Sequence, residues 1–248
     1  MVLDSGVFAA PHQSLNRFRA LRLAGLEAMA FARQAALLHR DMLAAYPARA
    51  TAGDDVVVLL HGLFATAGVL RPLKRRIEEA TFAHTASFTY VPGPGVERIA
   101  LRLRELVRVL PADVRLHLVG HSMGGVVMRW FMQELGGDPR VVQTVSLGSP
   151  FHGTRHARLV PSRCGRDIVP SSPLLQRLRQ RSRDSTVPHL SIAAARDSVV
   201  TEGALLPTGD HLVIKDCGHS GLLFHPSVGS EIVRRVRRFQ AAPARSVA

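Results

Sequence analysis

The stretch LVGHSMGG, residues 118–125, lies between two segments of different pattern. The residues that lead into it from position 114 are apolar enough for a short buried strand, and residues 126–135 have the pattern of a helix. A Gly-x-Ser-x-Gly sequence between a strand and a helix is typical of a nucleophile elbow, a tight turn that holds a serine hydroxyl clear of the sheet. Gly120 and Gly124 are expected because side chains there would collide with neighbouring backbone.

Strand-like apolar runs alternate with helical patterns on both sides of this turn. Residues 56–60 are apolar on both faces, as strands of a parallel sheet covered by helices are. Strands are expected at 56–60, 84–91, 114–119, 141–147, 187–193 and 211–215, and helices at 14–45, 68–80, 96–110, 126–135, 172–181 and 227–240. This alternation predicts an α/β protein with a mostly parallel, doubly wound sheet of about six strands flanked by helices.

The length of 248 residues and the hydrophobic fraction of 46% suit one α/β domain. We expect an N-terminal helical extension at 1–50, the α/β domain at 51–240 and a loose tail at 241–248. Within the domain, residues 151–186 are expected to form a small lid-like or cap-like insertion. The extension is predicted to pack on the domain surface, and a membrane-surface helix or a substrate-gating element is the sharper alternative.

The formal net charge is +13, and nearly all of the basic residues are arginines. A coding bias toward arginine and alanine is the simplest explanation. However, residues 151–183 hold eight arginines against one acid, Asp167, and this segment would suit contact with an anionic lipid surface. Aromatic residues make up 5% of the chain, and there is no stacking platform or recognition-helix motif, so nucleic acid is not an expected partner.

The first eleven residues contain Asp4 and no basic residue, so they lack the pattern of a secretory signal peptide. A cytoplasmic location is therefore favoured over secretion, although a mature secreted chain would look the same. Cys164 and Cys217 have no metal-binding spacing, and two reduced thiols are favoured over one disulfide. No metal and no cofactor are predicted.

Several polar residues follow the ends of separate predicted strands, where ligands bind in open α/β sheets. They are His61, Ser122, Ser149, Asp197 and His219. A serine hydroxyl needs a base within hydrogen-bond reach, and a histidine base needs an acid that fixes its tautomer. The order serine, acid, histidine is the one expected when an elbow serine begins the set. Ser122, Asp197 and His219 are therefore the predicted catalytic residues.

The acid and the histidine both have rivals in the sequence. The rival acids are Asp210 and Asp216, and the rival histidines are His211 and His225. Asp216 is three residues from His219, but its position at the very end of a strand suits an orienting role less well than that of Asp197. His211 is expected within a strand or at its start, which disfavours it as the base.

Five segments of the chain resemble bacterial lipases and esterases of the α/β-hydrolase fold. They are HGL at 61–63, GHSMGG at 120–125, LGSPFHGT at 147–154, DSVV at 197–200 and GHSGLL at 218–223. The elbow is only moderately specific, whereas the third and fifth segments are more so, and together the five span 56 to about 230. The resemblance implies the α/β-hydrolase fold, with Ser122 as nucleophile, His219 as base and Asp197 as acid.

The resemblance also implies an oxyanion hole formed by the backbone N–H groups of Leu63 and Met123. Phe64, Phe151 and Leu222 are predicted to line the substrate pocket, although core packing explains them equally well. Some lipases of this group bind a structural calcium ion near the histidine loop. No matching pair of acids is recognisable here, so the metal prediction stays at none.

The expected activity is serine carboxylic-ester hydrolysis of an acyl ester or lipid through an acyl-enzyme. Acyl transfer to an alcohol and thioester hydrolysis would use the same three residues. A non-catalytic, membrane-surface binding member of the fold is the alternative from another class. The complete set of Ser122, Asp197 and His219 argues against that alternative, because a silent member would tolerate the loss of any of them.

Overall fold

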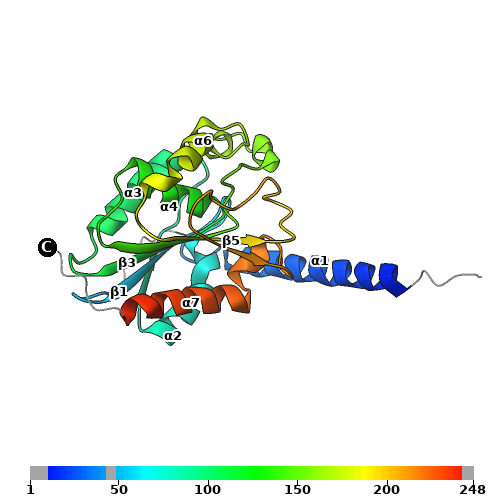
Figure 1. The fold of residues 1–248 in the computed structure, drawn as a ribbon, viewed down its shortest axis with the longest axis horizontal. Helices are drawn as coiled ribbons and strands as arrows, with labels where there is room; N and C mark the ends of the chain where they lie inside the picture. The colour runs from blue at the N-terminus through cyan, green and yellow to red at the C-terminus, as the bar shows by residue number, and fades with distance from the viewer. Residues whose placement is uncertain (1–10, 43–48, 242–248) are drawn as a thin grey trace, which may run out of the picture.

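The computed structural model describes residues 11–42 and 49–241 of the chain (Figure 1). Six strands form one sheet in which every neighbouring pair is parallel. They are β1 (Asp55–Leu60), β2 (His84–Ser87), β3 (Arg115–His121), β4 (Val141–Leu147), β5 (His189–Ala194) and β6 (Asp210–Ile214), in the order β2-β1-β3-β4-β5-β6. The predicted doubly wound parallel sheet is confirmed.

Helices cover both faces of the sheet (Figure 1). One face carries α3 (Val96–Arg108), α4 (Met123–Glu134) and α6 (Pro173–Gln180), and the other carries α2 (Arg71–Thr81) and α7 (Pro226–Gln240). Alternate residues of β1 enter the two cores, with Val58 in the first and Val57 in the second. The whole of β1 is buried because the sheet has no face in contact with solvent at this strand.

Two elements differ in extent from the sequence prediction. The strand expected at 84–91 ends at Ser87, after which the chain turns so that Tyr90 stacks on His61. The helix expected at 126–135 begins three residues earlier, at Met123, directly after the elbow serine. The glycines at 124 and 125 lie in the first turn of α4, where close contacts with neighbouring backbone or side chains leave no room for a larger residue.

The insertion at 151–186 contains more helix than expected. Besides α6 it holds η2 (Arg155–Leu159), α5 (Arg163–Asp167) and η3 (Arg181–Asp184). It is fastened to the domain by Asp167, whose Oδ2 accepts from the N–H of Val96 at 2.8 Å, and by Leu178, whose carbonyl accepts from Gln133 Nε2 at 3.0 Å. These contacts tie the segment to α3 and to α4, the helix that follows the elbow.

The N-terminal helix α1 (Pro11–Leu37) packs with its C-terminal half against the domain, and its N-terminal half projects beyond it (Figure 1). Arg33 lies over the ring of Phe224 at 5.0 Å, and Asp41 forms an ion pair with Arg71 at 2.8 Å. The helix was expected to continue to residue 45. It ends at Leu37, the chain reaches a left-handed backbone conformation at Asp41 with φ 56°, and residues 43–45 lie outside the described part.

The two cysteines lie in different cores and do not pair. Cys164 belongs to the core beneath α3 and α4, and Cys217 to the core beneath α2 and α7, and both are buried free thiols. Within residues 11–42 and 49–241, no helix combines the length and the apolar character needed to cross a membrane.

Candidate active site

Ser122 occupies the tip of a strained turn between β3 and α4. Its φ of 53° and ψ of −126° are unusual for a residue other than glycine, and its N–H donates to the carbonyl of Leu147 at 2.8 Å. A Cβ atom at Gly120 would lie 2.4 Å from the Gly125 nitrogen, and one at Gly124 would lie 2.5 Å from the Leu60 oxygen. The glycines are therefore required by close contacts between backbone segments, as the sequence pattern predicted.

Asp197 and His219 follow β5 and β6 and form a hydrogen bond in the interior. The distance from His219 Nδ1 to Asp197 Oδ2 is 2.7 Å, and both side chains are buried. The other carboxylate oxygen, Oδ1, accepts from the N–H groups of Val199 at 2.9 Å and Val200 at 2.7 Å. Because an ionised carboxylate only accepts, Nδ1 carries the imidazole proton and Nε2 is left with a lone pair.

Two of the rival residues are engaged elsewhere. Asp210 forms an ion pair with Arg235, and His211 Nε2 bonds to the carbonyl of Leu206 at 2.8 Å. Asp197 is the acid at the ring of His219, and the end of β4 passes directly beside this pair. A Cβ atom at Gly148, whose φ is 57°, would lie 3.1 Å from His219 Nδ1 and 3.3 Å from Asp197 Oδ2.

The three predicted catalytic residues stand at the same edge of the sheet, after β3, β5 and β6. The ring of His121, which precedes Ser122, has its centroid 4.9 Å from that of His219. In the described part of the chain, the hydroxyl of Ser122 forms no hydrogen bond, so it is not yet engaged with His219. Catalytic hydrogen bonds are often long before substrate binds and tighten in the complex.

The segment that follows β1, from His61 to Leu63, also borders Ser122. His61 Nδ1 bonds to the carbonyl of Gly62 at 2.7 Å, while its Nε2 accepts from the N–H of Tyr90 at 3.2 Å. Tyr90 also stacks on the imidazole at 3.8 Å and donates its hydroxyl to the carbonyl of His61. Burial lowers the pKa of His61 to about 4, so the ring is neutral and holds the segment in place rather than transferring protons.

Two backbone N–H groups border Ser122 and are unused within the described part of the chain. Met123 is the first residue of α4, and N–H groups in a first helical turn have no intrahelical acceptor. Leu63 follows Gly62, and a Cβ atom at Gly62 would lie 2.9 Å from the Cβ of Ser122. The N–H of Leu63 also donates to no other described group. Both N–H groups are therefore without an acceptor in the described part of the chain, and their role as an oxyanion hole stays a prediction.

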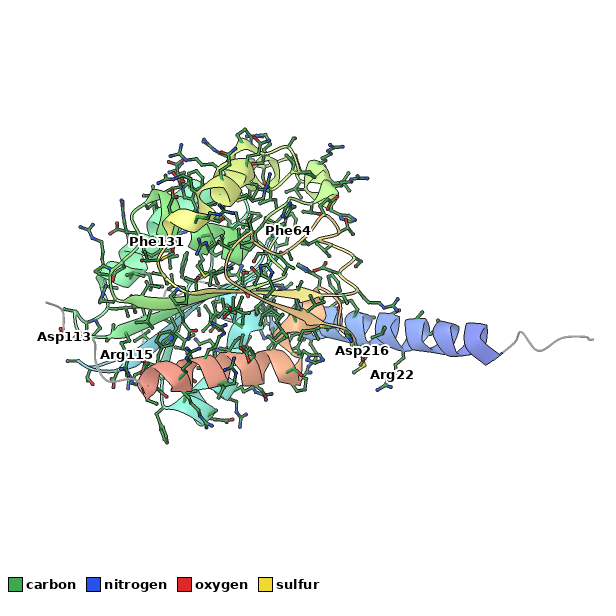
Figure 2. The ribbon with its side chains drawn as sticks, in the orientation of Figure 1. Arg22, Phe64, Asp113, Arg115, Phe131 and Asp216 are labelled. Carbon is green, nitrogen blue, oxygen red and sulfur yellow. The ribbon has the colours of Figure 1, made fainter. Side chains whose placement is uncertain are left out.

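The predicted substrate-binding residues differ in accessibility. Phe151 and Leu222 are fully buried, and Leu222 Cδ1 would lie 2.9 Å from a Cβ atom at Gly148, beside the histidine. Phe64 is 63% exposed and lies on the side of the sheet that carries the insertion (Figure 2). Of the three, Phe64 is thus the one that a substrate could reach without rearrangement. The described residues contain no group of three or more His, Cys, Asp or Glu side chains able to hold a metal ion.

Two further residues contact the histidine loop. His121 Nε2 lies 3.3 Å from the carbonyl of His219, and burial lowers the pKa of His121 to about 3. The Glu27 carboxylate of α1 accepts from the N–H groups of Ser220 and Gly221 at 2.6 and 3.1 Å. Glu27 is not among the residues that the sequence predicts for the site. The one sequence feature that sets Glu27 apart is that no other acidic residue lies between Asp4 and Asp41.

Comparisons with known proteins place the fold. No family model matches the chain, and no curated protein sequence matches it. Among solved structures, the mature form of the Bacillus licheniformis lipase BlEst2 is 14% identical with a TM-score of 0.59, covering 81% of this chain and 95% of that chain. The match covers only 53% of the propeptide form of the same lipase, again at 14% identity and with a TM-score of 0.60.

Two other similar structures are also described as lipolytic. One comes from work on LipS and LipT, two metagenome-derived lipolytic enzymes, with 13% identity, a TM-score of 0.59 and coverage of 79% of this chain and 99% of that chain. The other is a monoacylglycerol lipase of Paleococcus ferrophilus, with 14% identity, a TM-score of 0.57 and coverage of 79% and 98%. The likeness establishes that this chain has the α/β-hydrolase fold.

Proposed function

We propose that the protein is a serine carboxylic-ester hydrolase that acts on acyl esters or lipids. The observation that carries the proposal is the buried bond between Asp197 and His219 at the sheet edge where Ser122 sits on its strained turn. That bond leaves the imidazole with a free Nε2 lone pair, the form that a general base requires. The similar structures that are described as lipases are consistent with this chemistry.

The proposed reaction has two steps. Ser122 Oγ attacks the ester carbonyl carbon while His219 Nε2 takes the hydroxyl proton, and the N–H groups of Leu63 and Met123 bind the oxyanion. Loss of one such donor costs roughly 3–4 kcal/mol of transition-state stabilisation. The C–O bond breaks, and His219 gives its proton to the leaving alcohol. Water, deprotonated by His219, then attacks the acyl carbon. The bond from this carbon to Ser122 Oγ breaks, His219 returns the proton to Oγ, and the carboxylic acid is released.

The test is hydrolysis of p-nitrophenyl esters of graded acyl length by the wild type and by Ser122→Ala. Ser149→Ala is the matched control, because Ser149 is buried near the elbow and its hydroxyl has no partner in the described part. We expect Ser122→Ala to lose nearly all activity and Ser149→Ala to keep it. Comparable activity in wild type and Ser122→Ala would refute the proposal.

The same samples separate hydrolysis from the related reactions. Acyl thioesters and added acceptor alcohols are supplied in turn, and the products are identified by mass spectrometry. A clear preference for thioesters, or acyl transfer to the alcohol in place of hydrolysis, would move the assignment to a thioesterase or an acyltransferase with the same nucleophile. Absence of any turnover, together with no labelling of Ser122 by a fluorophosphonate, would favour a non-catalytic member of the fold.

A further inference from the structure

The carboxylate of Glu27 reaches from α1 to the loop that carries His219. Its Oε1 accepts from the N–H of Ser220 at 2.6 Å, and its Oε2 accepts from the N–H of Gly221 at 3.1 Å. These donors belong to η4 (Ser220–Leu223), the short helix that begins directly after His219. Since N–H groups in a first helical turn lack intrahelical acceptors, the carboxylate supplies the acceptors that this turn needs.

The loop is shaped to admit this carboxylate. A Cβ atom at Gly218 would lie 2.4 Å from Glu27 Oε2, and one at Gly221 would lie 3.3 Å from the same oxygen. The glycines that flank His219 therefore leave the space that Glu27 occupies. Burial raises the pKa of the neighbouring Cys217 thiol to about 12, and the negative charges of Glu27 and Asp197 act in the same direction.

His219 is held from three directions. Asp197 bonds to its ring, His121 lies at hydrogen-bond distance from its carbonyl, and Glu27 binds the two N–H groups that follow it. Asp197 and His121 belong to the sheet and its loops. Glu27 belongs to the N-terminal extension, so this extension directly contacts the loop that carries His219.

The extension is itself anchored to the segment that follows β1. The hydroxyl of Thr66, a few residues after Leu63, lies 3.1 Å from both the Leu38 and the Arg40 carbonyl oxygens. Asp41 forms two bonds of 2.8 Å to the Arg71 guanidinium. Glu27 is thus carried by a helix whose C-terminal end is fixed to the domain, so its carboxylate can hold the loop rather than follow it.

We propose that Glu27 is a positioning residue for His219, through which the N-terminal helix sets the distance between the imidazole and Ser122. The inference rests on the proposed hydrolase function. Glu27 itself touches no reacting atom. Without its carboxylate, the glycine-rich loop at 217–221 loses its two acceptors and His219 shifts. A displacement of about 1 Å in a catalytic group can cost on the order of 100-fold in rate.

The experiment measures kcat and KM for p-nitrophenyl esters in Glu27→Ala and Glu27→Gln. We expect kcat of Glu27→Ala to fall by roughly 10- to 100-fold with KM nearly unchanged, because both acylation and deacylation need His219. Glu27→Gln should be intermediate, because its amide oxygen can accept one N–H while its NH2 group faces the other. The rate of Ser122 labelling by a fluorophosphonate should fall in the same order.

Asp138→Asn is the matched control for a merely structural role. Asp138 Oδ1 accepts from the N–H of Arg140 and pairs with its guanidinium, both at 2.9 Å, just before β4 and at the opposite edge of the sheet from Ser122. We expect Asp138→Asn to lower Tm while leaving kcat near the wild-type value. A folded Glu27→Ala with kcat within about twofold of wild type would overturn the proposal, as would an equal loss of kcat in Asp138→Asn.

Gly218→Ala provides an independent arm. Its Cβ would displace the Glu27 carboxylate, so the substitution should lower kcat in the wild type and add little in a Glu27→Ala background. If the losses of kcat from Gly218→Ala and Glu27→Ala add fully in the double variant, Gly218 does not act through Glu27 and the proposal is wrong. If Glu27→Ala fails to fold, Glu27→Gln and Gly218→Ala decide the question.

Hydrogen exchange separates this proposal from the hydrolase assignment. If the wild type has no esterase activity, the hydrolase assignment fails. The contact between Glu27 and the histidine loop is then tested separately, through the exchange rates of the amide protons of Ser220 and Gly221. Faster exchange at these amides in Glu27→Gln than in wild type is the expected result. Unchanged exchange would refute the proposed positioning role of Glu27.

Discussion

Replacement of Asp197 by asparagine tests whether the histidine tautomer controls the reaction. Oδ1 accepts two backbone N–H groups at 2.9 and 2.7 Å, while Oδ2 faces His219 Nδ1 at 2.7 Å. An asparagine must keep its amide oxygen toward the two N–H donors, because the NH2 group would otherwise face them. The NH2 group then points at His219 Nδ1, which can accept only if its proton moves to Nε2. The imidazole then has no lone pair for the Ser122 hydroxyl.

The magnitude follows from this change of tautomer. The equivalent substitution in Ser-His-Asp triads lowers kcat by about 10⁴-fold, which corresponds to roughly 5 kcal/mol of activation free energy. The free energy of unfolding should fall by much less, on the order of 1–2 kcal/mol, because volume and both backbone bonds are preserved. Catalysis and stability are therefore expected to separate in Asp197→Asn, with a large loss in the first and a small loss in the second.

The assay is steady-state hydrolysis of a p-nitrophenyl ester, with urea unfolding measured on the same samples. Asp216→Asn is the control, because Asp216 is the rival acid nearest to His219 in sequence and should leave kcat within a few-fold of wild type. An Asp197→Asn variant that keeps more than about a tenth of the wild-type kcat would show that the tautomer argument is wrong. So would a larger loss in Asp216→Asn.

Two other predictions concern Gly120 of the elbow turn and His121, the residue that precedes Ser122. Gly120→Ala places a Cβ atom 2.4 Å from the Gly125 nitrogen, so the free energy of unfolding in urea should fall by at least about 2 kcal/mol, whereas Gly93→Ala, with no atom within 4 Å, should be nearly neutral. Equal stabilities would contradict the close contact. Burial holds the pKa of His121 at about 3, below its unfolded value, so the unfolded state binds the extra proton as the pH falls below about 6.5. His121 alone should therefore cost about 2 kcal/mol of stability between pH 7 and pH 5. His121→Gln should show a shallower loss over that range in urea titrations, and an unchanged slope would refute the assignment.

The sequence alone determined the fold class and the main members of the candidate site. Strand and helix patterns are local, since they depend on the spacing of apolar residues, and their alternation left a parallel doubly wound sheet as the natural arrangement. The elbow was readable for the same reason, because its glycines and serine are consecutive and the strain is confined to one turn. The order of Ser122, Asp197 and His219 after separate strands placed all three at one edge of the sheet.

The tertiary structure decided what depends on contacts between distant segments. Only the structure shows that Asp197, rather than Asp210, bonds to His219, because spacing along the chain does not fix the direction of a carboxylate. The early end of β2 is accompanied by the stacking of Tyr90 on His61, residues 29 positions apart. Glu27 lies 193 residues from Ser220, and no local pattern links a lone acid in a helix to a histidine loop at the other end of the chain. Such contacts arise only when the helix and the sheet are packed together, because short-range propensities carry no information about which surfaces meet.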